Sequence, residues 1–372
     1  MLKKMYLYLK RKTAIIEGFY RHTKYMCEGT YIYDNSIKYL IRNDSFTKNR
    51  AFQIFQNNYY QPSIKFYIFL LRNTLFRKKV SISEQPEKSM DFSGSIYRPV
   101  RSSNGYNDSK IFDISRNKVL SIFSNKQEYQ SVLNNYYRFN QFFPMPKILH
   151  SDSEKLLIME EMVNFTQNHA WVEEDYLFVM EDVFQRNITY FKDCIDKGIH
   201  SFTSPQKLLH SRATKPNIKI IKDLISPVLW SVQFPCIQLH GDLWTANTLL
   251  VKGDTRHTCF IDWEYSREYL FFYDVFNLMW LEVYVNNNHL YFQKYIDGDY
   301  DHYFEILFSF INLKFDEKLR LDYFMIYFLN FFTERVVYLN RTDQQHFTQQ
   351  CKRLIERMKL KEKKQERKLM TV

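Results

Sequence analysis

The stretch LHGDLWTANTLL, residues 239–250, places His240, Asp242 and Asn247 in a short polar turn between two apolar runs. The next apolar run along the chain ends in another acid, Asp262. A buried or half-buried carboxylate is costly unless a hydrogen-bond partner or a cation compensates its charge. We therefore expect the side chains of Asp242, Asn247 and Asp262 to converge around a shared cation.

The spacing H-x-D-x-x-x-x-N, with an acid after the next apolar strand, suits phosphoryl transfer from a nucleotide. That reaction needs one carboxylate to orient the attacking hydroxyl and accept its proton, and oxygen ligands for Mg²⁺. Asp242 is the predicted base. Asn247 and Asp262 are the predicted metal ligands, because Mg²⁺ takes hard oxygen donors and bridges phosphates. His240 is expected to brace this catalytic turn by hydrogen bonds rather than to titrate.

These segments resemble the catalytic region of the choline kinase and aminoglycoside phosphotransferase superfamily, whose members share the protein-kinase-like fold. The family's loop H-G/N-D-L-x-x-x-N matches residues 240–247, and its metal-binding segment I-D-F/W-E-Y-S matches residues 261–266. Asp274 and Asn277 match a further family motif, where the two residues are mainly structural. The specific match spans residues 238–278.

A weaker match in the order of elements extends from about residue 96 to residue 330, whereas residues 1–90 have no counterpart in the family. The resemblance implies a lysine on the third strand of the small lobe that grips the α- and β-phosphates, paired with a glutamate on the next helix. Ser121 stands in the register of that lysine, so Lys118 at the strand start or Lys126 beyond the strand end is the predicted substitute. Glu128 matches the family's glutamate. A surface lysine at the edge of a hairpin is the favoured explanation of Lys118.

Two further positions follow from the resemblance. The Ser/Asn/Gly turn that contains Ser103 and Gly105 is expected to lie over the phosphates, since backbone N–H groups and small polar side chains bind such anions. An ordinary hairpin turn explains the same residues. Met162, just after Glu160 and Glu161, falls where the backbone of the hinge contacts the adenine.

The pattern of elements predicts an α+β protein with a two-lobed, protein-kinase-like fold. We expect a basic, aromatic-rich N-terminal extension of unknown role at residues 1–90, made of short helical pieces. A small nucleotide-binding lobe with an antiparallel sheet follows at residues 91–165, in the order strand, strand, strand, helix, strand, strand. Residues 166–372 form a larger, mostly helical lobe that carries the catalytic and acceptor sites, with helices at residues 173–195 and 217–232.

The composition is that of a folded protein. The chain has 372 residues, 45% of them hydrophobic, which is enough for two lobes with sizeable cores. Its 28 tyrosines and 33 phenylalanines exclude a disordered chain. The net charge of +11 favours anionic partners such as nucleotides, nucleic acid or an acidic membrane face. Nucleic acid is the least favoured of these, because the sequence contains no motif that reads bases.

The cysteines and the apolar runs predict a cytoplasmic protein. The five cysteines have no spacing typical of a zinc site, and their odd number argues against a disulfide framework. The first residues lack the apolar core of a secretory signal. The longest apolar run, residues 323–332, is too short to cross a bilayer, which leaves peripheral contact with an acidic membrane surface as an expectation.

The predicted function is transfer of a phosphoryl group from ATP, with Mg²⁺, to the hydroxyl of a small amino alcohol, sugar or aminoglycoside-like acceptor. Trp280 and Tyr284 could bind a choline-like head group by cation–π contacts, although a place in the core is favoured. Glu264 and Glu282 could pair with an amino-bearing acceptor. The alternative function is a catalytically impaired, kinase-like regulatory or scaffold protein, because the phosphate-binding lysine is missing from its strand.

Overall fold

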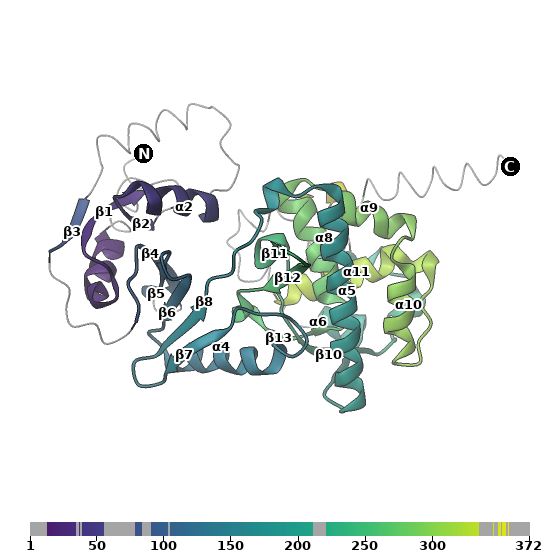
Figure 1. Ribbon diagram of the computed structural model, residues 1–372. Helices are drawn as coiled ribbons and strands as arrows, with labels where there is room; N and C mark the ends of the chain where they lie inside the picture. The colour runs from purple at the N-terminus through teal and green to yellow at the C-terminus, as the bar shows by residue number, and fades with distance from the viewer. Residues whose placement is uncertain are drawn as a thin grey trace. The chain divides into compact units, whose positions relative to one another are not determined.

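The computed structural model divides the chain into two compact units (Figure 1). The first unit runs to Trp171 and includes Leu249–Ile261, and the second contains Val172–Thr248 and the chain from Asp262 onward. The structure describes residues 13–34, 37, 39–55, 79–83, 91–102, 105–210, 221–334, 345, 349–350, 352–354 and 356.

An antiparallel sheet is the framework of the first unit. Its described residues form eight strands in the order β3-β1-β2-β4-β5-β6-β8-β7. Helices α2 and α4 and the paired strands β11 and β12 belong to the same unit. The bounds are β1 Gly29–Asp34, β2 Tyr39–Arg42, α2 Ser45–Phe55, β3 Lys79–Ile82, β4 Ile96–Ser102, β5 Gly105–Asp113, β6 Lys118–Ile122, α4 Lys126–Phe139, β7 Ile148–Asp152, β8 Leu157–Glu161, β11 Thr248–Lys252 and β12 Arg256–Phe260.

The two faces of this sheet bury different clusters, because successive side chains of a strand point to opposite faces. One face packs with the helix at residues 13–21 into a large cluster that includes Phe19, Tyr31 and Leu120. The other face carries two smaller clusters. Phe112 packs there in the cluster that includes Ala51 of α2, and Ile158 packs with residues of α4.

Helix α4 is well defined by its sequence. Asn125 is the N-cap, and its side-chain oxygen accepts a hydrogen bond of 2.8 Å from the backbone nitrogen of Gln127. Glu128 lies in the first turn, where a carboxylate is favoured by the helix dipole. Tyr129 and Leu133 are four residues apart and are both buried against the sheet, so the apolar stripe of the helix covers one end of that face.

The second unit is mainly helical. A short sheet with strand order β13-β10-β9 accompanies the helices, and α8 and α11 contribute many of its buried aromatic side chains. The ring centroid of Phe276 of α8, for example, lies 5.1–5.4 Å from those of Phe272, Tyr295, Phe304 and Phe324. The bounds are α5 Glu173–Asp196, β9 Ser201–Thr203, α6 Pro205–His210, β10 Phe234–Leu239, β13 Arg267–Leu270, α8 Tyr273–Asn286, α9 Leu290–Asp297, α10 Asp301–Ser309 and α11 Arg320–Glu334.

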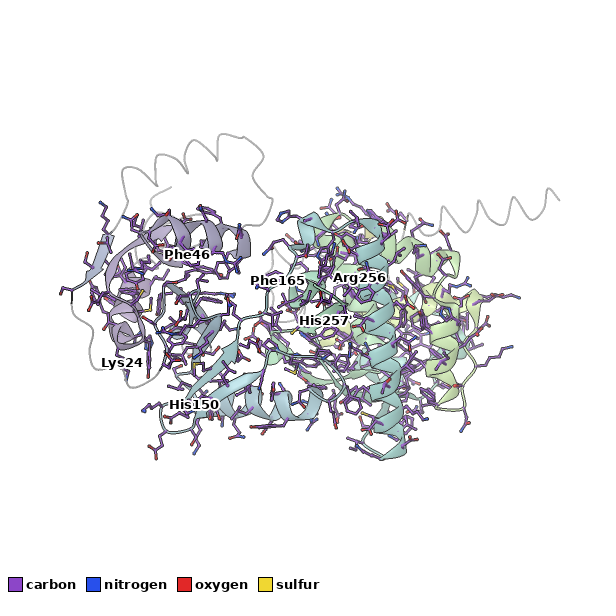
Figure 2. The ribbon with its side chains drawn as sticks, in the orientation of Figure 1. Lys24, Phe46, His150, Phe165, Arg256 and His257 are labelled. Carbon is purple, nitrogen blue, oxygen red and sulfur yellow. The ribbon has the colours of Figure 1, made fainter. Side chains whose placement is uncertain are left out.

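Outside these cores, both apolar and basic side chains are exposed. Figure 2 shows Phe46 on α2, which is 58% exposed, and the exposed side chains Arg256 and His257 at the start of β12. Scattered exposed aromatic residues are normal on protein surfaces. No helix among the described residues is long and apolar enough to cross a membrane.

The predicted α+β class is confirmed, and so is the order of strands and helix between residues 96 and 163. Two predicted features are wrong. The described part of residues 1–80 contains strands as well as helices, and β1–β3 pair into the same sheet as β4–β8. The helix expected at residues 217–232 is interrupted in its described part: residues 221–222 are helical, and residues 223–232 form turns and a 3₁₀ turn at Pro227–Leu229. Proline disfavours helix at the residue before it and removes a donor, which explains this break. The expected domain boundaries near residues 90 and 165 stay a prediction.

Candidate active site

The polar turn between β10 and β11 begins with a buried histidine. His240 is 1% exposed, and its Nδ1 accepts a hydrogen bond of 3.3 Å from the backbone nitrogen of Asp242. Its ring centroid lies 4.5 Å from that of Trp263. Because Nδ1 accepts, the neutral tautomer carries its proton on Nε2. In this arrangement His240 holds the turn in shape and links it to the segment that follows Asp262.

Gly241 is required by the backbone of the turn. Its φ is +76°, in the left-handed region that residues with a Cβ rarely adopt. A Cβ at this position would lie 2.4 Å from Cε2 of Tyr269 and 2.7 Å from the carbonyl oxygen of Tyr265. The turn therefore packs so closely against the segment 265–269 that only glycine fits.

Two side chains at the start of α8 hold the turn by hydrogen bonds. The buried carboxylate of Asp274 accepts hydrogen bonds from the backbone nitrogens of His240 at 2.8 Å and Gly241 at 2.9 Å. Asn277 donates from Nδ2 to the carbonyl oxygen of Leu243 at 3.0 Å. These bonds hold the backbone of the turn at His240, Gly241 and Leu243, and they agree with the structural role that the resemblance implied for Asp274 and Asn277.

Asp242 and Asn247 lie next to each other. Asn247 donates from Nδ2 to the carbonyl oxygen of Asp242 at 2.8 Å and to its Oδ2 at 3.3 Å. Since the amide nitrogen faces Asp242, the amide oxygen of Asn247 points to the opposite side. The Asp242 side chain is only half-buried, so its carboxylate remains accessible to a substrate. The pair thus presents one carboxylate and one amide oxygen from the same turn.

Asp262 reaches the same region through a hairpin. β11 and β12 pair with each other, and a connection of a few residues between paired strands requires that they run antiparallel. Asn247 directly precedes β11 and Asp262 follows β12, so both lie at the open end of this hairpin. Asp262 is half-buried and has the left-handed angles φ 61° and ψ 53°, which are uncommon for a residue with a Cβ. Unusual backbone of this kind clusters at functional sites.

The donor set fits magnesium. Mg²⁺ usually binds one or two protein oxygens, waters and the phosphates of a substrate, rather than a cage made only of side chains. Asn247 and Asp262 supply one amide and one carboxylate oxygen. Among the described residues no group of three or more His, Cys, Asp or Glu side chains could hold a metal ion.

A buried carboxyl group supports the middle of the turn. Glu282 of α8 is fully buried, and its Oε1 accepts hydrogen bonds from the hydroxyl of Thr245 and, at 2.9 Å, from Nδ2 of Asn286. Burial raises the pKa of Glu282, and the hydrogen bonds from Thr245 and Asn286 offset part of this rise. A side chain in this position contacts the turn rather than an acceptor, unlike the role expected for Glu282.

Sequence reasoning did not identify Thr245 or Asn286 as part of this support. The available signal was the spacing between Glu282 and Asn286, one helical turn apart and therefore on the same face of α8. Trp280 is fully buried, stacks on Tyr284 at 5.4 Å and meets Phe328 edge-on at 4.9 Å. Trp280 therefore belongs to the core, as favoured.

In the first unit, the residues expected to bind nucleotide are spread over several elements. Nζ of Lys118 donates to Oδ2 of Asp91 at 3.1 Å and to its carbonyl oxygen at 3.0 Å, and Asp91 is 75% exposed. Lys118 is thus held at the surface. Glu128 lies in the first turn of α4, and Met162 packs at the edge of the cluster around Phe112.

The expected phosphate loop is only partly described. Ser103 lies outside the described residues, and Gly105 is the first residue of β5. The register of β4 and β5 shifts between Val100 and Ser102, where the hairpin approaches its turn. The roles of Ser103 and Gly105 therefore stay a prediction.

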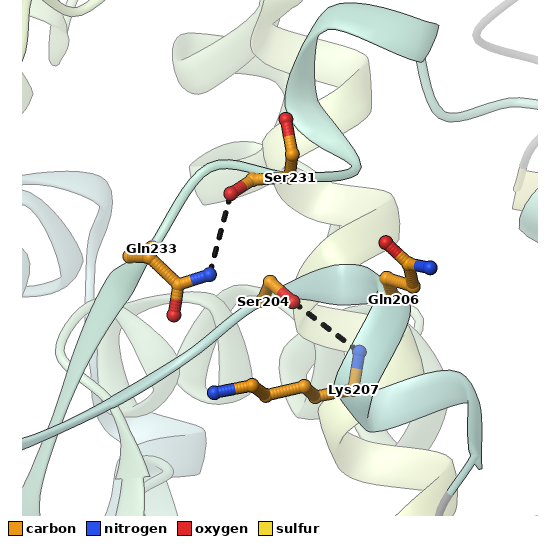
Figure 3. Close-up of a pocket in the computed structure, with 5 residues that line it drawn as sticks. All are labelled: Ser204, Gln206, Lys207, Ser231 and Gln233. Atoms are coloured by element: carbon orange, nitrogen blue, oxygen red, sulfur yellow. Dashed lines mark hydrogen bonds between the residues drawn. The ribbon is translucent and has the colours of Figure 1, made fainter.

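A separate pocket lies in the second unit (Figure 3). It has a volume of about 450 Å³ and contains none of the predicted catalytic or metal-binding residues. Local hydrogen bonds hold its wall, including one of 3.3 Å from the backbone nitrogen of Lys207 to Oγ of Ser204. The lining residues are Ser204, Gln206, Lys207, Ser231 and Gln233.

Three solved structures are similar to this chain at low sequence identity. Choline kinase LicA from Streptococcus pneumoniae is 11% identical, with a TM-score of 0.36, and the match covers 70% of this chain and 92% of that one. A thermostable mutant of aminoglycoside phosphotransferase APH(4)-Ia, in a ternary complex with ADP and hygromycin B, is 15% identical, with a TM-score of 0.43 and coverage of 71% and 94%. An ethanolamine kinase from Plasmodium vivax is 13% identical, with a TM-score of 0.31 and coverage of 83% and 94%.

The sequence comparison is more specific. No curated protein matches the chain. The model of the phosphotransferase enzyme family matches residues 211–305, a range that contains the whole polar turn, Asp262 and all of α8 and α9. The resemblance predicted from the two motifs is therefore confirmed. Over residues 211–305 this chain is similar to the phosphotransferase enzyme family, the same kind of family to which its two motifs pointed.

Proposed function

We propose that this protein is an ATP-dependent phosphotransferase that acts on the hydroxyl group of a small molecule in the cytoplasm. The observation that carries the proposal is the hydrogen-bonded pair of Asp242 and Asn247, with Asp262 at the same end of the hairpin. The match to the phosphotransferase enzyme family supports the reaction class.

Each residue of the turn has a defined task in this proposal. Asp242 accepts a hydrogen bond from the acceptor hydroxyl, orients it toward the γ-phosphorus and takes its proton as the new P–O bond forms. The bond between the γ-phosphorus and the β,γ-bridging oxygen breaks in the same transfer, and ADP leaves with that oxygen. Asn247 and Asp262 bind Mg²⁺, which supplies positive charge to the phosphates. His240, Asp274 and Glu282 hold the turn, so Asp242 keeps its position without reorganisation during the reaction.

The acceptor belongs to a class of hydroxyl compounds rather than to one compound. Amino alcohols, sugars and aminoglycoside-like molecules all offer the nucleophile that Asp242 needs. Glu264 is exposed next to Asp262, so it remains a candidate partner for an amino group on the acceptor. The expected contact with an acidic membrane surface is not part of the proposal, because no feature of the described residues supports it.

The test is ATP consumption by the purified full-length chain against a panel of amino alcohols, sugars and aminoglycosides. We expect at least one acceptor class to be phosphorylated in the presence of Mg²⁺. Asp242→Ala should lower the rate by roughly 10²- to 10⁴-fold, the usual contribution of a general base, with unchanged circular dichroism. Activity equal to the wild type in this variant would remove Asp242 from its role.

The second candidate function, a catalytically impaired scaffold, draws on Ser121 in the place of the expected lysine. A thermal-shift titration with Mg²⁺ and ATP separates the two functions. Stabilisation of the wild type, lost in Asp262→Ala, supports the phosphotransferase, since a ligand that binds only the folded state raises its melting temperature. A melting temperature that does not respond to nucleotide in either protein supports the scaffold.

A further inference from the structure

A row of side chains crosses the sheet of the first unit at the strand where the phosphate-binding lysine is missing. Lys110 of β5 lies directly opposite Ser121 of β6. On its other side, Lys110 lies opposite Arg98 of β4. Residues directly opposite on antiparallel strands point to the same face, with their Cβ atoms about 4.5–5.5 Å apart. Arg98, Lys110 and Ser121 therefore share one face of the sheet.

The neighbours of the row show which face this is. Phe112, two residues after Lys110, packs in the cluster that includes Ala51 of α2. Ile158, directly opposite Ser121, packs with Tyr129 of α4. The row thus lies on the sheet face whose two ends are covered by α2 and α4. That face also receives the helix whose first turn carries Glu128.

The burial and charge of the row favour an anionic ligand. Ser121 is 6% exposed and Lys110 is half-buried. The side chain of Lys110 starts from the strand next to the position at which the family's lysine would stand. Like charges directly opposite on neighbouring strands repel, and a bound anion offsets that cost. The guanidinium carbon of Arg98 lies 5.5 Å from the ring centre of Tyr39.

Lys118 is a weaker candidate on geometric grounds. It lies opposite Asp113 of β5 and Glu161 of β8, at the far end of the strand from Ile122, and its Nζ is bonded to Asp91. Residues 118 and 121 are separated by an odd number of positions, so their side chains point to opposite faces of the sheet. Lys118 would have to leave its ion pair and cross to the other face to replace the missing lysine.

We propose that Lys110 is the phosphate-binding lysine of this chain, supplied by β5 instead of β6, and that its ligand is the triphosphate of ATP. The inference rests on the proposed function and names a residue that the family motif does not assign. A lysine side chain is long enough to bring its ammonium group from β5 into the space above Ser121. Arg98 adds positive charge next to it.

Calorimetric titration of the full-length chain with Mg²⁺·ATP, without acceptor, tests this role. Lys110→Met keeps the apolar stem of the side chain and removes the charge. Loss of one charge-assisted hydrogen bond should weaken ATP binding roughly 10- to 100-fold. Binding of adenosine, which lacks phosphates, should stay within about twofold of the wild type, which shows that the variant is folded.

Lys155→Ala is the matched control. Lys155 lies in the turn between β7 and β8, is 54% exposed and pairs with Asp152 at 3.3 Å. Lys155→Ala also removes one positive charge from the first unit, and the affinity for ATP should not change. The exchange Lys110→Ser with Ser121→Lys should restore most of the affinity lost in Lys110→Met, because it returns a lysine to the same row.

The outcomes separate this inference from the proposed function. A wild-type chain that does not bind Mg²⁺·ATP contradicts both. A wild type that binds, with Lys110→Met binding equally well, overturns the inference and leaves the proposed function standing. A larger loss in Lys118→Ala than in Lys110→Met would also overturn it, since the ammonium group would then come from Lys118.

Discussion

At the scale of single residues, Gly241 is the position where the catalytic turn tolerates least change. Gly241→Ala would strain a backbone with φ +76° and force Tyr269 to move, since the new Cβ would lie 2.4 Å from its ring. We expect a loss of about 1–3 kcal/mol in the free energy of unfolding, measured with urea. Gly253→Ala is the control, because a Cβ there meets nothing within 4 Å. Equal stability of the two variants would contradict the close packing of the turn.

Glu282 makes a second residue-scale prediction, which concerns pH. Burial raises the pKa of Glu282 in the folded state above its unfolded value of about 4.3. Its contribution to stability is therefore fully present below the unfolded pKa and is lost as the pH rises toward the folded pKa. Glu282→Gln keeps an oxygen that accepts from Thr245 and Asn286 but does not titrate.

The free energy of unfolding of Glu282→Gln should thus increase relative to that of the wild type as the pH rises above about 4.3. The increase should be at most about 1.4 kcal/mol per pH unit. Urea unfolding of both proteins between pH 4 and pH 8 measures this difference. A difference that stays constant over the whole range would show that Glu282 does not have a raised pKa.

At the scale of elements, the catalytic turn could be predicted from sequence because its residues are spaced by local geometry. His240, Asp242 and Asn247 lie within one turn, and Asp262 follows the next strand. The register that brings Lys110 beside Ser121 depends on pairing between strands, which spacing along the chain does not reveal. The supporting hydrogen bond that the hydroxyl of Thr245 donates to Glu282 spans 37 positions and could not be predicted for the same reason.

Helix α8 carries the element-scale prediction, because it anchors the turn at one end and lies in the aromatic core at the other. Phe276 is fully buried among four or more rings, so Phe276→Ala removes a large contact area and leaves a cavity. We expect a loss of about 3–5 kcal/mol in the unfolding of the second unit, followed by tryptophan fluorescence. Phe202→Ala in the same unit, at 50% exposure, should lose much less. Similar losses in both variants would contradict the buried position of Phe276.

At the scale of the whole molecule, the strands before residue 90 change how the first unit is understood. The sequence before residue 90 is rich in aromatic and basic residues, and its short segments, such as YIYD and YLIR, resemble pieces of helix although they form strands. These strands continue the sheet, since Leu40 and Ile41 of β2 pair with Tyr97 and Ile96 of β4. Strand pairing over so many intervening residues gives no local signal, and this is why the region was expected to be an appendage.

Removal of residues 1–90 should therefore destabilise the rest of the first unit. The truncated chain would expose the edge of β4 and uncover Tyr97 and Ile111, which belong to the same cluster as Tyr31 in the full-length chain. An uncovered, apolar sheet edge pairs readily with other chains. We expect the truncated protein to aggregate in size-exclusion chromatography, or to melt at a lower temperature than the full-length chain.

A substitution in the full-length chain tests the same role of the N-terminal strands and creates no new chain end. The hydroxyl of Tyr31 donates to the carbonyl oxygens of Cys27 at 2.7 Å and Gly94 at 3.0 Å, and so ties the N-terminal strands to the start of β4. Tyr31→Phe leaves the carbonyl oxygen of Cys27 without this donor, which should cost about 1–3 kcal/mol in unfolding. The carbonyl oxygen of Gly94 still accepts from the backbone nitrogen of Cys27 at 2.9 Å. Urea unfolding of the first unit measures the loss. If Tyr31→Phe is neutral and the truncated chain stays monomeric with an unchanged melting temperature, β1–β3 are dispensable for the sheet, and the face that carries Lys110 needs only β4–β8.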